Sequence, residues 1–304
     1  MVPFRIHILG CGSALPTTRH FPSMQIVECR GKLFMIDCGE GAQLQMRRMS
    51  ISFSKLGQIF ITHIHGDHCF GLIGMISSFG LLVRTAPLHI YGPAELEPML
   101  TAQMKMFCRD LGYEVVYHAV DTTVHQVIYD DKSVQVESIP LEHRLPCCGF
   151  LIREKASLPH IRRDMLDMYN IPISQINNIK NGQDYVMDDG TVIAHERLLT
   201  PADPPRSYAY CSDTRYMPGL HQLIQGVDTL YHESTYGDDN EQMAQKYNHS
   251  TARQAALVAQ EAKVGKLLLG HYSSRYNDEN VLLRQAQEVF PNSFLTNEMN
   301  VFDV

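Results

Sequence analysis

Four potential metal ligands lie within the run THIHGDH, Thr62–His68, which directly follows an apolar segment. His63 and His65 point to the same side of an extended chain because side chains alternate along a strand, and the glycine that follows permits a turn that brings Asp67 and His68 into the same space. Imidazole nitrogens and a carboxylate suit zinc, and a catalytic zinc ion keeps an open position beside three protein ligands. The run therefore predicts a catalytic metal site, and surface histidines on a loop are the alternative.

Further ligands are expected after later strands, because one short loop cannot surround two metal ions. His143 follows the strand-like run SVQVESIPLE, Asp213 follows YAYCS, and His271 ends KLLLGH. Each is a metal-ligand residue type at the end of a buried-strand pattern, where sites form in layered α/β folds. A single residue of this kind is more often an ordinary loop residue. The three residues are candidate metal ligands because all of them share the position directly after a strand.

Two further motifs suggest proton transfer rather than metal binding. The run HEST contains Glu233 at the end of a predicted strand, and the run NHSTA places His249 just before a predicted helix. The two hydroxyl residues after His249 are good helix caps, and capping alone explains them but not the histidine. A histidine beside a helix amino terminus and near a carboxylate can bind a phosphate oxygen or protonate a leaving group.

Strand-like and helix-like patterns alternate over most of the chain. The strands cluster first and then alternate with helices in two halves, which favours an α/β fold with two sheets between helical layers over one doubly wound sheet. The predicted strands cover residues 4–10, 24–29, 33–37, 58–62, 88–92, 114–118, 135–139, 208–212, 228–234 and 266–271. The predicted helices cover residues 40–49, 67–82, 93–108, 218–225, 250–264 and 279–289.

One segment, residues 153–189, interrupts this alternation. It is polar, contains two prolines and shows no strand of convincing length, and its charges nearly cancel. A long insertion inside a compact domain is usually functional or mobile. We therefore expect a single domain over residues 1–304 with an inserted arm at about 153–189.

Composition narrows the choice of partners and compartment. The chain of 304 residues has a formal net charge of −7, so a broadly basic surface that coats nucleic acid is excluded and a polyanion must be held by a local patch or by metal ions. The eight cysteines are scattered without a CxxC pair, which predicts reduced thiols and a cytoplasmic location. The longest apolar stretch, residues 69–83, is shorter than a membrane span, so no membrane association is expected.

Taken together, the motifs resemble those of the metallo-β-lactamase superfamily, and more closely those of the ribonuclease Z family, the endonucleases that mature the 3′ end of transfer RNA precursors. The resemblance runs nearly end to end. THIHGDH marks only the superfamily, whereas HSTA and SSRY mark the ribonuclease Z branch. The matching motifs are LGCGSALP (9–16), DCGEGAQ (37–43), THIHGDHCFGL (62–72), PLEHR (140–144), SDTR (212–215), HEST (232–235), HSTA (249–252) and HYSSRY (271–276).

The resemblance implies an αββα sandwich with a dinuclear zinc site. Its ligands are then His63, His65 and His143 for one zinc, Asp67, His68 and His271 for the other, and Asp213 as the bridge. Asp67 also orients or deprotonates the attacking water, and His249, oriented by Glu233, serves the leaving 3′ oxygen. Two metals in such a site lower the pKa of a bridging water and offset the charge on the phosphoryl oxygens.

The same resemblance implies a zinc-dependent endoribonuclease that removes the 3′ trailer of precursor tRNA, cutting after the discriminator base to leave a 3′ hydroxyl. Two Zn²⁺ per subunit are implied, with Mn²⁺ or Fe²⁺ as substitutes, and so is a homodimer. The Met and Phe content of residues 71–82 suits either a dimer surface or the core. Asp37 is expected to brace the metal loop, and Arg275 either contacts a phosphate or makes a structural ion pair.

Two departures concern substrate recognition rather than metal chemistry. The PxKxRN loop of many bacterial members reads PTTRHF here, at Pro16–Phe21, and the arm has NIPISQI at Asn170–Ile176 where a GlyPro step is usual. These departures and the negative net charge keep open a second activity on the same scaffold, a small-molecule phosphodiesterase or ester hydrolase. A binding module without activity is the third alternative, and it is disfavoured because all seven ligand positions hold competent residue types.

Overall fold

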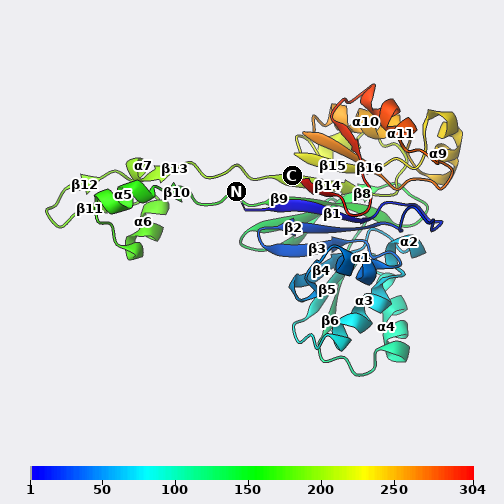
Figure 1. Cartoon of the computed structure of the whole chain (residues 1–304), viewed down its shortest axis with the longest axis horizontal. Helices are drawn as coiled ribbons and strands as arrows, with labels where there is room; N and C mark the ends of the chain where they lie inside the picture. The colour runs from blue at the N-terminus through cyan, green and yellow to red at the C-terminus, as the bar shows by residue number, and fades with distance from the viewer. Residues whose placement is uncertain (1) are drawn as a thin grey trace. The chain divides into compact units, whose positions relative to one another are not determined.

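The computed structural model describes residues 2–304, which form two compact units (Figure 1). The main unit comprises residues 2–153 and 206–304, and the arm unit comprises Glu154–Pro205. The arm unit spans residues 154–205, and the sequence places the inserted arm at about 153–189. The additional residues include two short strands and a short helix that belong to the same unit.

The first sheet of the main unit has seven strands in the order β18-β1-β2-β3-β4-β5-β6. The strands from β3 to β6 are parallel, whereas β18, β1, β2 and β3 pair in an antiparallel manner. Their bounds are β1 Phe4–Gly10, β2 Met24–Cys29, β3 Lys32–Ile36, β4 Leu56–Phe60, β5 Leu88–Gly92, β6 Val115–Ala119 and β18 Val301–Asp303.

The second sheet also has seven strands, in the order β17-β16-β15-β14-β9-β8-β7. The strands from β14 to β17 are parallel, and β9 pairs antiparallel with β14. Their bounds are β7 Gln126–Asp130, β8 Val134–Leu141, β9 Cys147–Glu154, β14 Ser207–Cys211, β15 Thr229–Glu233, β16 Lys266–Gly270 and β17 Ser293–Leu295. The parallel strands all end at the same edge, which is where the predicted ligands follow them.

Helices lie on the outer faces of both sheets (Figure 1). Those beside the first sheet are α1 Ala42–Arg48, α3 Leu72–Leu81 and α4 Leu96–Phe107, and those beside the second are α8 Leu220–Leu223, α10 Ala252–Glu261 and α11 Asn280–Gln287. The shorter helices of the main unit are α2 Gly66–Cys69, α9 Glu241–Tyr247, η1 Phe53–Lys55 and η3 Asp238–Asn240.

Two apolar cores hold these layers together. One core lies between the sheets, where the ring centroids of Phe60 on β4 and Phe150 on β9 are 5.4 Å apart, and it continues beneath α10 and α11. The other core joins the opposite face of the first sheet to α3, with Ile59 and Phe79 fully or almost fully buried. The predicted α/β fold of two sheets between helical layers is confirmed.

Some elements differ from the prediction. The helix expected over 67–82 is two helices, α2 and α3, because the chain passes very close to another turn at Gly71. The Gly71 N–H donates to the Cys38 carbonyl at 2.8 Å, and a Cβ on Gly71 would lie 2.1 Å from the Gly39 oxygen. The sequence analysis also missed β7, β9, β17, β18 and α9. Almost every residue of β9 is buried, so this strand lacks the alternating pattern that identifies a half-exposed strand.

The arm unit has its own small core of Ile171, Ile179, Ile193 and Leu198. Its elements are β10 His160–Ile161, α5 Arg163–Met168, η2 Ile173–Gln175, α6 Ile176–Lys180, β11 Tyr185–Val186, β12 Val192–Ile193, α7 His195–Leu198 and β13 Leu199–Thr200. Its strands have only two residues each and form two small pairs. No helix within residues 2–304 is both long and apolar enough to cross a membrane.

Candidate metal centre

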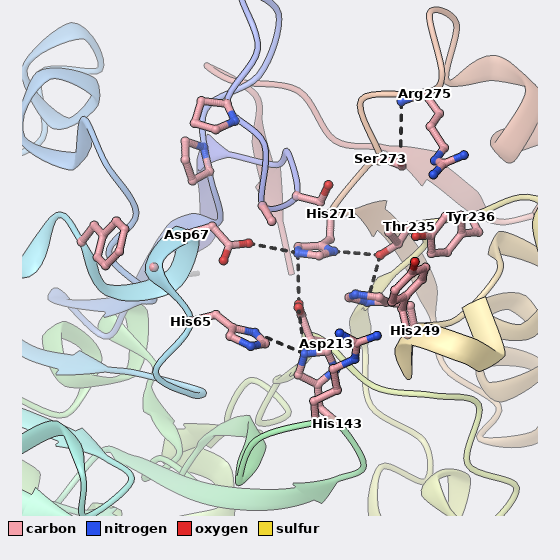
Figure 2. Close-up of a pocket in the computed structure, with 18 of the residues that line it drawn as sticks. His65, Asp67, His143, Asp213, Thr235, Tyr236, His249, His271, Ser273 and Arg275 are labelled. Atoms are coloured by element: carbon pink, nitrogen blue, oxygen red, sulfur yellow. Dashed lines mark hydrogen bonds and ion pairs between the residues drawn. The ribbon is translucent and has the colours of Figure 1, made fainter. Parts of the chain in front are cut away.

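The seven predicted ligands meet at one end of the two sheets, beside a cavity of about 610 Å³. Figure 2 shows His65, Asp67, His143, Asp213 and His271 around this cavity. They are His63 and His65 after β4, Asp67 and His68 in α2, His143 after β8, Asp213 after β14, and His271 after β16. The side chains that line the cavity include His65, Asp67 and His271, whereas His63 and His68 are fully buried. The fold therefore brings together residues that are more than 200 positions apart in the sequence.

The first group of ligands consists of three histidines and one carboxylate. His63 Nε2 and His65 Nδ1 lie 2.8 Å apart, and His143 Nε2 lies 3.3 Å from the same His65 atom. Asp213 Oδ2 is 3.8 Å from both His63 Nε2 and His143 Nε2. One ligand atom from each residue therefore converges on a common point, as a metal ion requires.

The second group shares Asp213 with the first. His68 Nε2 lies 3.4 Å from both Asp67 Oδ2 and Asp213 Oδ1, and His271 Nε2 lies 3.6 Å and 3.2 Å from the same two oxygens. Burial alone raises the pKa of the Asp67 carboxyl, but His68 and His271 outweigh burial and lower that pKa, so Asp67 stays ionised. The two oxygens of Asp213 therefore face different groups, Oδ2 toward His63 and His143 and Oδ1 toward His68 and His271.

The chemistry of these residues fits two metal ions. Among residues 2–304, the buried Nε2 atoms of His68 and His271 have no hydrogen-bond partner, although a buried polar atom without a partner is costly. Burial lowers the pKa values of His63, His65 and His143, which favours the neutral imidazole that metal ions bind. A cation in each group would satisfy the buried nitrogens and offset the carboxylate charge.

A fully buried carboxylate, Asp37, holds the first-sheet ligands in place. Its Oδ1 accepts hydrogen bonds from the Thr62 N–H at 2.9 Å and the Thr62 hydroxyl at 3.0 Å, and its Oδ2 accepts from His68 Nδ1 at 2.7 Å and the Tyr210 hydroxyl at 3.1 Å. The Thr62 hydroxyl also lies 3.0 Å from His63 Nδ1. We call these five residues the Asp37 hub; because both Nδ1 atoms are engaged, both Nε2 atoms face the metal groups. This agrees with the bracing role predicted for Asp37.

A second fully buried carboxylate, Glu233, has the same arrangement on the second sheet. Its Oε1 accepts from the Thr214 N–H and from His249 Nδ1, both at 2.8 Å, and its Oε2 accepts from the Thr235 N–H at 3.3 Å and from the Thr235 hydroxyl. The Thr235 hydroxyl also lies 2.8 Å from His271 Nδ1 (Figure 2). We call these five residues the Glu233 hub, and it fixes the ring orientation of His271 as the Asp37 hub fixes that of His68.

His249 is more exposed than the histidines buried beneath it. Its side chain is 14% exposed, whereas those of His63 and His68 are 0% exposed. Burial alone lowers the pKa of His249, but the Glu233 carboxylate outweighs burial and raises that pKa to about 9. Because Glu233 holds Nδ1, Nε2 is the atom of His249 that is available to a molecule in the cavity, and it is protonated near neutral pH.

Comparison with known proteins identifies close relatives. The chain is 55% identical over 298 residues to "Ribonuclease Z" of Bacteroides fragilis strain YCH46, an alignment that covers 98% of each chain. It is 48% identical over 304 residues to "Ribonuclease Z" of Porphyromonas gingivalis strain W83, with both chains covered completely. The chain belongs to the ribonuclease Z family.

Solved structures resemble the chain in fold, and a family model with a different description matches about its first half. The short form of human tRNase Z superimposes on the chain with a TM-score of 0.71 at 23% identity and 98% coverage of each chain. The metallo-beta-lactamase fold protein YhfI of Bacillus subtilis superimposes with a TM-score of 0.70 at 17% identity, and the superposition covers 99% of this chain and all of YhfI. These likenesses show the fold. A family model described as "Anti-Pycsar protein Apyc1" matches residues 4–166, which include the run Thr62–His68.

The loop that departs from the usual ribonuclease Z motif lies at the rim of the cavity. Pro16, the first residue of the loop, and Pro22, which directly follows the loop, line the cavity. Arg19 donates to Glu279 Oε1 at 2.9 Å, and His20 Nδ1 lies 3.0 Å from Glu298 Oε2. The two basic side chains of the loop are therefore bound to carboxylates in the C-terminal part of the chain.

Arg275 is different, because it lines the cavity and has no ion-pair partner in the part of the chain from Val2 onward. Its backbone N–H donates to the Ser273 hydroxyl at 3.4 Å (Figure 2). Of the two roles predicted for this side chain, a structural ion pair is not present among these residues. The guanidinium faces the cavity with its charge uncompensated.

The sequence analysis missed the residues that hold the ligands. The hydroxyls of Thr62 and Thr235 fix histidine rings, and the motifs alone do not indicate this role. The available signal is a threonine directly before His63 and a threonine two residues after Glu233. Tyr210 carried no signal, because its hydrogen bond to Asp37 joins residues 173 positions apart on different sheets.

Proposed function

We propose that this protein is a metal-dependent endoribonuclease that removes the 3′ trailer of precursor tRNA, cutting after the discriminator base to leave a 3′ hydroxyl. The observation that carries the proposal is 55% identity over nearly the whole chain to a protein named ribonuclease Z. It is supported by the convergence of all seven predicted ligands on two groups that share Asp213.

The proposed resident metal is zinc, with two ions per subunit. His63, His65 and His143 hold one ion in this proposal, and Asp67, His68 and His271 hold the other, with Asp213 between them. Bound zinc supplies Lewis acidity toward the phosphoryl oxygens and lowers the pKa of bound water. The ligand set of imidazoles and carboxylates without a thiolate supports zinc, and it also accepts Mn²⁺ or Fe²⁺.

The protein's own groups then position the substrate and move protons. Asp67 orients the attacking water through the carboxylate that stays ionised in the buried site. His249, held by Glu233 at 2.8 Å, donates the proton on Nε2 to the departing 3′ oxygen. Arg275, at the rim of the cavity, binds a phosphate of the RNA strand.

Cleavage of one precursor tRNA tests this function directly. The zinc-loaded wild-type protein is expected to release the trailer of a precursor tRNA. The variant His65→Ala lacks one proposed ligand of the first group, and it is expected to release no trailer. The variant controls for a contaminating nuclease. An intact substrate after incubation with the metal-loaded wild type contradicts the proposal.

The same assay separates the tRNA role from the alternative chemistry. If the RNA stays intact while the protein hydrolyses a small phosphodiester such as bis-p-nitrophenyl phosphate in a His65-dependent manner, the metal site is right and the substrate is a small molecule. If neither substrate is hydrolysed by a protein that retains two metals, the site does not work as a phosphodiesterase.

A homodimer in the cytoplasm is part of the proposal. Apolar side chains are exposed at the C-terminal ends of α3 and α4, two helices that pack on each other, and these side chains support a contact with a second copy. They are Leu81, Leu82, Val83, Met106 and Phe107. All eight cysteines are free, which suits a reducing compartment. Light scattering during size-exclusion chromatography measures the oligomeric state.

A further inference from the structure

A cation and an aromatic ring are stacked on one wall of the cavity. Tyr247 and Arg144 both line it, and the guanidinium carbon of Arg144 lies 4.6 Å from the centroid of the Tyr247 ring. The Arg144 side chain donates to the Lys246 carbonyl at 3.4 Å and has no carboxylate partner in residues 2–304. Lys246 Nζ also lies 5.3 Å from this centroid. The wall therefore combines an aromatic ring with two positive charges, and neither Tyr247 nor Arg144 has a role in the mechanism above.

The turn after α9 fixes this pair relative to the metal centre. Tyr247 ends the helix, Asn248 follows with a left-handed backbone at φ +55°, and His249 comes next. The Asn248 carbonyl accepts a hydrogen bond from His143 Nδ1 at 2.9 Å, and the His249 N–H donates to the Ala244 carbonyl at 2.9 Å. The same three-residue turn thus carries Tyr247, orients a metal ligand and presents His249.

Because Tyr247 and Arg144 lie beside His249, the part of the substrate that they contact can be inferred. Cleavage that leaves a 3′ hydroxyl breaks the bond between phosphorus and the 3′ oxygen, so the group that protonates this oxygen lies against the nucleotide on the 5′ side of the cut. His143 and Tyr236 flank His249, with ring centroids 5.0 Å and 6.1 Å away (Figure 2). Tyr247 and Arg144 continue the wall next to it.

We propose that Tyr247 and Arg144 form the subsite for the last nucleotide retained by the product, with its base stacked on Tyr247 and its 5′ phosphate bound by Arg144. The inference rests on the proposed function, because it takes His249 as the group nearest the leaving oxygen. Base stacking on an aromatic ring tolerates all four bases. Such a subsite accepts any discriminator base, as a processing enzyme with many tRNA substrates needs.

A cycle of changes in the protein and in the RNA tests the stacking contact. Cleavage is measured for a precursor tRNA and for the same RNA with an abasic residue at the discriminator position. Stacking contributes about 1–3 kcal/mol per base, so Tyr247→Ala is expected to lower kcat/KM about tenfold on the normal RNA and to have almost no further effect on the abasic RNA. Tyr247→Phe keeps the ring and is expected to behave as the wild type on both.

A binding measurement tests the phosphate contact without catalysis. The Kd of the mature tRNA that ends at the discriminator is measured by fluorescence anisotropy over a range of salt concentrations. Arg144→Gln is expected to weaken binding and to reduce the slope of log Kd against log salt by about one, because one phosphate contact is lost. Arg109→Gln and Tyr117→Ala are matched controls, since this arginine and this tyrosine line a separate cavity, and neither is expected to change cleavage or binding.

The outcomes distinguish the subsite from the function on which it rests. If the wild type does not cleave the normal precursor, the proposed function fails. If the wild type cleaves it but the Tyr247→Ala and abasic effects multiply independently, the function stands and the subsite is wrong. If Arg144→Gln binds the mature tRNA with the same salt dependence as the wild type, Arg144 does not contact a phosphate and this part of the proposal is wrong.

Discussion

The Asp37 hub and the Glu233 hub are built from the same parts on opposite sheets. In each, a fully buried carboxylate accepts the N–H and the hydroxyl of one threonine and the Nδ1–H of one histidine. In each, the threonine hydroxyl contacts a second histidine, His63 in one hub and His271 in the other. Both hubs therefore fix two imidazole rings by means of one carboxylate and one hydroxyl.

The difference lies in what the two histidines of each hub do. In the Asp37 hub, both Nε2 atoms face the metal groups and both rings are fully buried. In the Glu233 hub, the ring of His271 is buried against Asp67 and Asp213, whereas His249 is partly exposed at the cavity. In the proposed function, both histidines of the Asp37 hub bind metal, whereas in the Glu233 hub His271 binds metal and His249 transfers a proton. In this proposal, the exposure of the His249 ring separates its role from that of the buried rings.

The largest expected effect comes from His249, the residue that distinguishes the hubs. His249→Asn is expected to lower kcat for tRNA cleavage by about 10²–10⁴, because general acid catalysis is lost, while the protein retains both metals. Rates on precursor tRNA and metal content by mass spectrometry measure this. The loss should be much smaller on bis-p-nitrophenyl phosphate, whose leaving group needs no proton.

His221→Asn is the control, since this histidine contacts the Pro218 carbonyl outside the cavity. An equal loss on both substrates, or a loss of metal from His249→Asn, would give His249 a ligand role and remove the distinction between the hubs.

The next effect is on metal affinity, and it distinguishes the role of Asp37 from that of Glu233. Asp37→Asn is expected to weaken metal binding about 10–100-fold, as loss of a group that orients ligands does, because it disturbs His63 and His68 together. Glu233→Gln is expected to weaken metal binding less, because among the proposed ligands Glu233 orients only His271, through the Thr235 hydroxyl. The same variant is expected to slow cleavage strongly, because Glu233 also holds His249. Competition with a chromophoric chelator gives the affinities.

Asp131→Asn provides a matched control for Asp37, because the Asp131 carboxylate also accepts several hydrogen bonds, from Ser133, Val134 and Tyr129, away from the cavity. We expect this variant to lose stability without losing metal affinity. If Asp37→Asn binds metal as tightly as the wild type, the Asp37 hub has only a structural role.

The smallest effect tests the one hub contact that crosses between the sheets. Tyr210→Phe removes one of four hydrogen bonds to Asp37 and is expected to weaken metal binding several-fold. A hydrogen bond to a charged group contributes about 1.5–3 kcal/mol, of which only part reaches the metal site. Tyr208→Phe is the matched control, because this tyrosine lies on the same strand and makes an equally buried bond between the sheets, to Gln25. Equal metal affinities for the two variants would contradict a role for Tyr210 beyond stability.

The sequence predicted the parts of the site that depend on local spacing. The run Thr62–His68 supplies four ligands within one loop and helix start, so its pattern alone indicated a metal site. His143, Asp213 and His271 could be proposed because each follows a recognisable strand. Strand alternation and helical spacing likewise predicted the two sheets and most helices, but not the almost fully buried β9.

The contacts between distant segments could not be predicted. The hydrogen bond from Tyr210 to Asp37 and the stack of Arg144 on Tyr247 depend on how two sheets and a turn pack, and nothing in the local sequence records that packing. The position of His249 beside Glu233 was suggested by two motifs, but their distance of 2.8 Å is a property of the folded chain. The full extent of the arm was also not visible, since its last elements are only two to four residues long.

In the proposed reaction, this site cuts precursor tRNA so that the 3′ oxygen departs and is protonated. The most direct measurement is the mapping of both new ends after cleavage by the zinc-loaded wild type. We predict a tRNA that ends in a 3′ hydroxyl at the discriminator and a trailer that begins with a 5′ phosphate. A 3′ phosphate or a 2′,3′-cyclic phosphate on the tRNA, or an uncut precursor, would contradict the account.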